Sequence, residues 1–189
     1  MKLISSLTAL ALCAIASVAP SPAAAQGTFR LASPTLKRNG TIGMEHVFNG
    51  FGCTGKNVSP ALSWSGAPAG TKSFAITVYD PDAPTGSGWW HWTVVNIPST
   101  VTSLAAGAGS TAPAGLPKGA AQGRTDFGKP GWGGPCPPAG DKPHHYIFTV
   151  WALKTDKLDL NGEASGAMVG FNLHGASLAK ATFTARFGR

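Results

Sequence analysis

The segment Ser73–Asp80 is the strongest constraint on the fold, because its side chains alternate between two faces as they do in a β-strand. Asp80 falls on the same face as three apolar residues, Phe74, Ile76 and Val78. A carboxylate on that face needs a partner or a change of protonation, since burying an unpaired charge is costly. The simpler alternative is that Asp80 caps the turn that follows.

Other segments extend the strand pattern. Trp90–Ile97 predicts a strand with Trp89, His91, Thr93 and Val95 on one face and Trp90, Trp92 and Val94 on the other. His144–Leu153 predicts a long, central strand that places His144 with Tyr146 and turns His145 away from them. Helical spacing over Glu163–His174 and alternation over Ser177–Phe187 predict one helix and a last strand. The pattern favours a mostly β fold, an antiparallel sandwich with a short helix near the C-terminus.

The first 25 residues have the composition of a cleaved export signal. Lys2 gives a positive start, Leu3–Val18 is apolar, and Ala23–Ala25 offers the small residues that precede a cleavage site. A lipid anchor on Cys13 is a weaker alternative, because Leu12 is bulky for such a site. We therefore expect residues 1–25 to be a signal peptide, residues 26–189 to form one domain, and the protein to be periplasmic or secreted.

The chain is basic, with 15 Lys and Arg against 8 Asp and Glu and a net charge of +7. These cations are scattered from Arg30 to Arg189 without a run or an aromatic-interleaved patch, which argues against nucleic acid as a partner. A mildly cationic surface instead favours anionic ligands and is compatible with peripheral contact to a membrane.

Removal of the signal peptide leaves Cys53 and Cys136 as the remaining cysteines. In an oxidising compartment we expect them to pair, although two separate buried thiols are the alternative. A bridge would tie the loop FGCTGKNVSP to the loop GWGGPCPP. In the chain-entropy model, closing so long a loop stabilises the fold by about 4 kcal/mol.

The segment DPDAPTGSGWWHWTVVNIP has the character of a pocket wall. Pro81 and Pro84 fix the backbone, so that Asp80 and Asp82 are presented rigidly. A second stretch, FGKPGWGGPCPPAGDKPHHY, combines glycines that let backbone approach a ligand with prolines that stiffen it. It closes a long irregular region, residues 99–143, and loops of that length inside a domain are often functional.

As a set, these motifs resemble the phosphatidylethanolamine-binding protein family, in its bacterial Raf-kinase-inhibitor-like branch of YbhB/YbcL type. The strings are DPDAP, WWHWTVVNIP, GPCPP followed by HHYIFTVWAL, and NGFGCTGKNVSP, in the family's order over nearly the whole mature chain. The resemblance implies two antiparallel sheets in Greek-key order and one small anion-binding pocket. Its residues would be Asp80, Asp82, Pro84, His91, Gly134, Pro135, Pro137, His144 and Tyr146. The sequence departs at His145, where many eukaryotic members have arginine, and the pocket-lining C-terminal helix of those members also differs.

The residue types suggest how such a pocket would work. Carboxylates repel phosphate, so the donors to an anion would be His91, His144, Tyr146 and backbone N–H groups. We expect Asp80 or Asp82 to accept a hydrogen bond from His91 and so favour its protonated form. The other carboxylate would take an ammonium or hydroxyl group from the ligand. A phosphoethanolamine-like head group would satisfy both halves of such a site, bound without catalysis or a cofactor.

Three alternatives remain at this stage. A metal could recruit two histidines and a carboxylate, namely His91, His144 and Asp80, although no HxH or HExxH spacing is present. A hydrolase could use a serine near the Asp and His residues, yet the chain lacks a GxSxG elbow; the candidates are Ser59, Ser63 and Ser87. The pocket could instead be vestigial, with the protein inhibiting a protein target through its surface; the candidates are Trp89, Trp90 and Trp132. A homodimer is a further possible partner.

Overall fold

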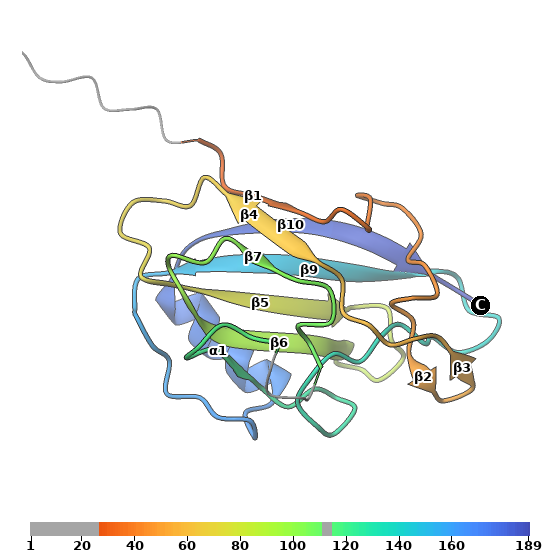
Figure 1. Cartoon of the computed structure of the whole chain (residues 1–189). Helices are drawn as coiled ribbons and strands as arrows, with labels where there is room; N and C mark the ends of the chain where they lie inside the picture. Colours follow the sequence, from red (N-terminus) through yellow and green to blue (C-terminus); the bar gives the residue numbers. More distant parts are fainter. Residues whose placement is uncertain (1–26, 111–114) are drawn as a thin grey trace, which may run out of the picture.

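The computed structural model describes residues 27–110 and 115–189, so the predicted signal peptide lies outside the described residues (Figure 1). Its centre is a five-stranded antiparallel sheet in the order β10-β9-β5-β6-β8. The strands are β5 (Ser73–Asp80), β6 (Trp89–Pro98), β8 (Ala121–Gln122), β9 (His144–Leu153) and β10 (Ser177–Phe187). The bounds of β5, β9 and β10 are those that the alternation of apolar residues predicts.

Two further layers cover this sheet, one on each face (Figure 1). A three-stranded sheet in the order β1-β4-β7 packs on one face, and the helix α1 (Gly166–Ala176) covers the other. The remaining strands are β1 (Arg30–Ala32), β2 (Asn49–Gly50), β3 (Cys53–Thr54), β4 (Leu62–Ser65) and β7 (Ser103–Leu104). β2 and β3 form a small separate hairpin. The fold is therefore mostly β with one helix near the C-terminus, as predicted.

The alternation in β5 sorts its side chains between the two cores. Phe74, Ile76 and Val78 enter the core between the sheets, whereas Ala75 packs with Val169 and Leu173 of α1. Asp80, at the end of the strand, is buried on the inter-sheet side. The predicted helix begins later than its spacing suggests, because the Ser165 hydroxyl accepts a hydrogen bond from the Met168 amide and caps the first turn.

The prediction for the faces of β6 is wrong at the start of the strand, for Trp89, Trp90 and His91, and the cause is a β-bulge. Val78 pairs with Trp92 and Tyr79 pairs with Trp90, so His91 has no residue opposite it on β5. The extra residue reverses the alternation. His91 consequently shares the inter-sheet side with Trp92, whereas Thr93 and Val95 face the helix side.

The disulfide between Cys53 and Cys136 is present, which confirms the predicted pairing. It joins the β2–β3 hairpin to the loop that precedes β9. Within the described residues, no helix is long and apolar enough to cross a membrane.

Candidate functional site

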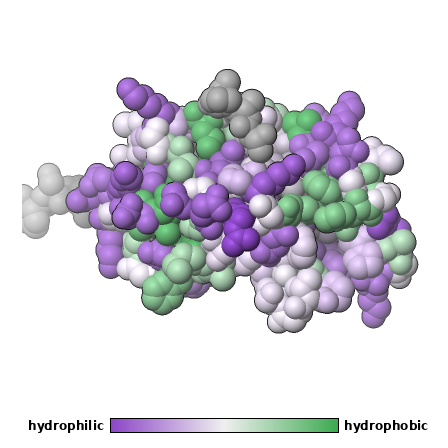
Figure 2. Space-filling view, turned by 90° about the horizontal axis from the view of Figure 1, so that it is seen from below, coloured by the Kyte–Doolittle hydropathy of each residue, from purple (hydrophilic) through white to green (hydrophobic). Residues whose placement is uncertain are grey.

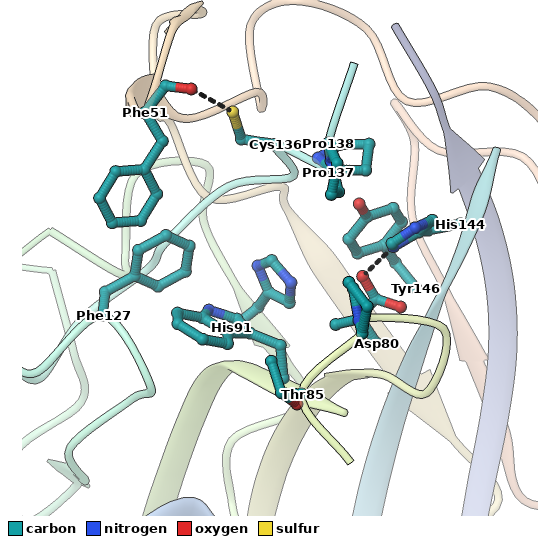
Figure 3. Close-up of a pocket in the computed structure, with 13 residues that line it drawn as sticks. Phe51, Asp80, Thr85, His91, Phe127, Cys136, Pro137, Pro138, His144 and Tyr146 are labelled. Carbon is teal, nitrogen blue, oxygen red and sulfur yellow. Dashed lines mark hydrogen bonds and ion pairs between the residues drawn. The ribbon is translucent and has the colours of Figure 1, made fainter. Parts of the chain in front are cut away.

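A pocket of about 230 Å³ opens at the end of the inter-sheet core, where β5, β6 and β9 meet the proline-rich loop (Figure 3). Its walls are mostly aromatic rings and prolines, and its polar side chains are few. The lining residues are Phe51, Asp80, Ala83, Pro84, Thr85, Trp89, His91, Phe127, Cys136, Pro137, Pro138, His144 and Tyr146. An apolar concavity with a few convergent polar groups is typical of a small-molecule site.

Asp80 is 2% exposed, and both of its carboxylate oxygens are used. Oδ1 accepts from the Asp82 amide at 2.8 Å, and Oδ2 lies 2.7 Å from Nδ1 of His144. The two expectations for Asp80, a buried partner and a cap on the turn, therefore hold together. The bond to Asp80 also orients His144, whose Nε2 lies 3.5 Å from the Asp141 carboxylate.

His91 does not have the partner expected from the sequence. Its Nδ1 lies 2.6 Å from the carbonyl oxygen of Gly133, not near a carboxylate. Burial lowers the pKa of His91 to about 4, and the hydrogen bond to Gly133 and the charges of Asp80 and Asp126 offset this only in part. The ring is therefore neutral near pH 7, and the expectation that a carboxylate accepts from His91 and favours its protonated form is wrong.

Tyr146 is fully buried, and its hydroxyl is close enough to the Asp80 carboxylate to interact with it, although no hydrogen bond of regular geometry joins the two. Burial raises the pKa of this phenol far above its usual value, and the nearby charges of Asp80 and Asp82 raise it further. The hydroxyl thus keeps its proton at any ordinary pH. Its ring packs edge-on to His91, with the ring centres 5.1 Å apart, and Figure 3 shows both rings at the pocket.

Asp82 lies outside the pocket, in contrast to Asp80. Its Oδ2 accepts from both the backbone amide and Nδ1 of His145, each at 2.7 Å. Although burial alone raises the pKa of Asp82, these hydrogen bonds and the charges of His145 and His144 bring it below the usual value. The structure thus forms two Asp–His pairs from these motifs. Asp80 and His144 are the inner pair, at the pocket, and Asp82 and His145 are the outer pair.

The GPCPP loop forms one wall of the pocket, but its first two residues do not line it. The Gly134 amide donates to Oδ1 of Asn57, and the Pro135 carbonyl accepts from the Phe48 amide. A side chain on Gly134 would lie 2.1 Å from the His46 carbonyl, so only glycine fits this approach. Both residues position the wall, which Cys136, Pro137 and Pro138 then form.

The aromatic side of the pocket comes from loops that the sequence reading did not assign. Phe127 packs edge-on to two rings of the pocket, with its ring centre 5.4 Å from that of Trp89 and 5.5 Å from that of His91. Phe51, at the tip of the β2–β3 hairpin, is 68% exposed and has a positive φ of 53°. A bulky residue in that conformation is uncommon, and the glycines on both sides of Phe51 were the available signal.

The Arg189 guanidinium ties this hairpin to the proline wall. Nε donates to the Pro137 carbonyl at 2.7 Å, and the other nitrogens donate to the carbonyls of Phe51 and Gly52. The hairpin that carries the exposed aromatic ring is therefore held by both the disulfide and an arginine.

The structure also bears on the three alternative hypotheses, which are a metal site, a serine hydrolase and a protein that acts through surface tryptophans. Across residues 27–110 and 115–189, no three His, Cys, Asp or Glu side chains are grouped as a metal site would need. None of the candidate serines lines the pocket, and Ser59 instead accepts from the Gly109 amide. Trp132 is buried and cannot serve as a surface contact, whereas Trp89 and Trp90 are half-buried.

Comparison with known proteins gives consistent matches. The family model described as phosphatidylethanolamine-binding protein matches residues 32–188. YbcL of Escherichia coli K12 is 60% identical over 156 residues, which cover 82% of this chain and 85% of that protein. YbhB of the same organism is 54% identical over 158 residues, which cover 84% and 99%. The crystal structure of E. coli YbcL, described as a new member of the mammalian PEBP family, matches with a TM-score of 0.85 at 57% identity, covering 86% of this chain and 99% of that one.

A more distant relative adds a different kind of description. A protein of Mycobacterium tuberculosis is 40% identical over 135 residues, which cover 71% of this chain and 60% of that protein. Its name contains the word lipoprotein.

Proposed function

The chain belongs to the phosphatidylethanolamine-binding protein family, and from that premise we propose that its pocket binds a small anion or a phospholipid head group of phosphoethanolamine type. One observation carries the proposal: the Tyr146 hydroxyl and Nε2 of His91 are buried at the pocket without a partner. An unpaired buried polar atom costs about 1–3 kcal/mol, which a ligand that pairs with it recovers.

A zwitterionic head group suits the distribution of charge in the pocket. The Tyr146 O–H is free to donate to a phosphate oxygen, while the carboxylate of Asp80 attracts an ammonium group. The apolar walls would cover the carbon atoms between and beyond the two charged groups. In this proposal the protein is a binding protein that needs no cofactor and performs no catalysis.

We also propose that the protein works outside the cytoplasm, in the periplasm or after secretion. The Cys53–Cys136 disulfide supports this, since such bonds persist in oxidising compartments. The word lipoprotein in the name of the mycobacterial relative points the same way, as does the signal-like composition of residues 1–25.

Replacing Tyr146 with phenylalanine is expected to separate binding from stability. The variant Tyr146→Phe should bind phosphate at least about tenfold more weakly, because one hydrogen bond to a charged group contributes about 1.5–3 kcal/mol. It should also unfold at a slightly higher temperature, since the unpaired hydroxyl is gone. Calorimetric titration and thermal unfolding measure the two effects.

Tyr79 provides the matched control, because it is the other tyrosine of the chain. Its hydroxyl donates to the Ser87 carbonyl at 2.7 Å, outside the pocket. Tyr79→Phe should therefore lose about 1 kcal/mol of stability and bind phosphate normally. Equal phosphate affinity in Tyr146→Phe and in the unmodified protein would count against the proposed site.

A second candidate function is action through the surface, on a protein target or on another copy of the chain. It is favoured by Phe171 and Met168, two apolar side chains of α1 that are 78% and 52% exposed. Figure 2 shows apolar areas on the face of the molecule that includes the α1 side. If this face mediates self-association, Phe171→Glu should sediment as a monomer where the unmodified chain sediments as a dimer. A monomer in both cases removes the homodimer from consideration.

A further inference from the structure

The inner end of the pocket is richer in hydrogen-bond acceptors than an anion site would require. Nδ1 of His91 must carry the ring proton, because its partner, the Gly133 carbonyl, can only accept. A neutral His91 then has a bare lone pair on Nε2, which is buried and unpaired. This atom can accept a hydrogen bond but cannot donate one.

The neighbouring groups do not compensate for this. The oxygens of the Asp80 carboxylate already accept from the Asp82 amide and from His144. A carboxylate has no hydrogen to donate, so Asp80 can only accept a further hydrogen bond from a ligand. His144 is hydrogen-bonded to Asp80 through Nδ1, and its Nε2 lies 3.5 Å from the Asp141 carboxylate. The donors without a partner at this pocket are therefore the Tyr146 O–H and the Trp89 indole N–H. A fully ionised oxyanion would gain these donors but would still face two acceptors, Nε2 of His91 and Asp80, with no hydrogen to share.

We propose that the pocket selects oxyanions that bring their own proton, so that phosphate or a phosphate monoester binds as the monoanion and donates its P–O–H to Nε2 of His91 or to Asp80. The inference rests on the proposed function and narrows its ligand. Sulfate, which has the same shape but no proton near neutral pH, is then rejected. In a phosphoethanolamine diester the ammonium group supplies the hydrogen instead, so the shared requirement is a donor on the ligand.

The surroundings of His91 explain why the protein does not supply the proton itself. The groups that face the ring are Asp80 from β5, Tyr146 from β9, Asp126 from the loop after β8, and the backbone of Gly133 and Gly134. Burial outweighs the two carboxylates and keeps the pKa of the imidazole at about 4. Because the ring is neutral near pH 7, it carries no proton that it can donate from Nε2 to an ionised ligand.

Calorimetric titration of the whole protein with inorganic phosphate and with sulfate tests the proposal. At pH 7, phosphate should bind at least about 100-fold more tightly than sulfate. Above the second ionisation of inorganic phosphate, at about pH 7, the phosphate affinity should fall about tenfold per pH unit, with one proton taken up per bound phosphate. Sulfate that binds as tightly as phosphate overturns the inference while leaving anion binding intact. Binding of neither anion overturns the proposed function as well.

Two variants locate the acceptor. In His91→Gln the amide can turn its NH₂ toward the ligand, so the preference for phosphate over sulfate should fall below about tenfold. In Tyr146→Phe both anions lose the same donor, so binding should weaken while the proton uptake with phosphate persists. An unchanged preference in His91→Gln argues against the role of Nε2, and circular dichroism establishes that each variant is folded.

A second pair of ligands distinguishes a lipid head group from free phosphate. Glycerophosphoethanolamine and glycerophosphocholine are both diesters without a P–O–H, and the ammonium hydrogens are absent from the second. Tighter binding of the first supports a ligand-borne donor at this position and assigns it to the head group. Equal binding of both diesters, at the affinity of phosphate, contradicts the requirement for a donor.

Discussion

Replacing both Cys53 and Cys136 with alanine is expected to lower the free energy of unfolding by about 4–5 kcal/mol. The two residues are 83 positions apart, and the chain-entropy model assigns a large stabilisation to the closure of so long a loop. For a domain of this size, that loss corresponds to roughly 10–15 °C in the unfolding midpoint.

Denaturant unfolding of the unmodified protein and the double variant measures this loss. The unmodified protein unfolded in the presence of a reductant is the control, and its midpoint should move toward that of the variant. Phosphate affinity should also decrease, because the bond holds the Phe51 hairpin beside the wall formed by Pro137 and Pro138. A double variant with the midpoint of the unmodified protein would mean that the remaining contacts, including those of Arg189, hold the hairpin alone.

Removing the carboxylate of Asp80 is expected to cost about 3–5 kcal/mol of stability, because it leaves His144 buried without its partner. The side chains of both residues are at most 5% exposed, so water cannot replace the lost group. Phosphoethanolamine should bind at least about tenfold more weakly to Asp80→Ala, since the ammonium loses its carboxylate.

Asp82→Ala is the matched control, because it removes the other carboxylate of the same motif. Its ion pair with His145 is about 40% exposed, and exposed pairs contribute no more than about 1 kcal/mol. Since the pKa of Asp82 is lowered in the folded state, its contribution is present above about pH 4 and is lost as the pH falls further. Equal destabilisation by the two substitutions would refute the distinction between an inner and an outer pair.

Local patterns in the sequence were sufficient for the strands that build the site. Strict alternation placed Asp80 at the buried end of β5 and separated His144 from His145 on β9, and both features are present. The reason is that side-chain direction in a regular strand depends only on position along the chain.

The partner of His91 could not be predicted in this way. Its orientation depends on a bulge, which is a property of the pairing between β5 and β6 and leaves no mark in the alternation of β6 alone. Phe51 and Phe127 were missed for a related reason, since loops far apart in the sequence bring them together. The DPDAP motif likewise did not reveal that Asp82 would turn outward to His145.

The bulge in β6 also bears on how binding could be gained or lost during evolution. His91 lies between Trp90 and Trp92 and has no counterpart on β5, so a single-residue deletion there would make the pairing with β5 regular at this point. The sandwich would then persist while its ligand-facing imidazole disappeared. One residue more or less at this point of β6 therefore changes ligand binding without changing the fold. Two homologues with the same fold can differ in the ligands that they bind.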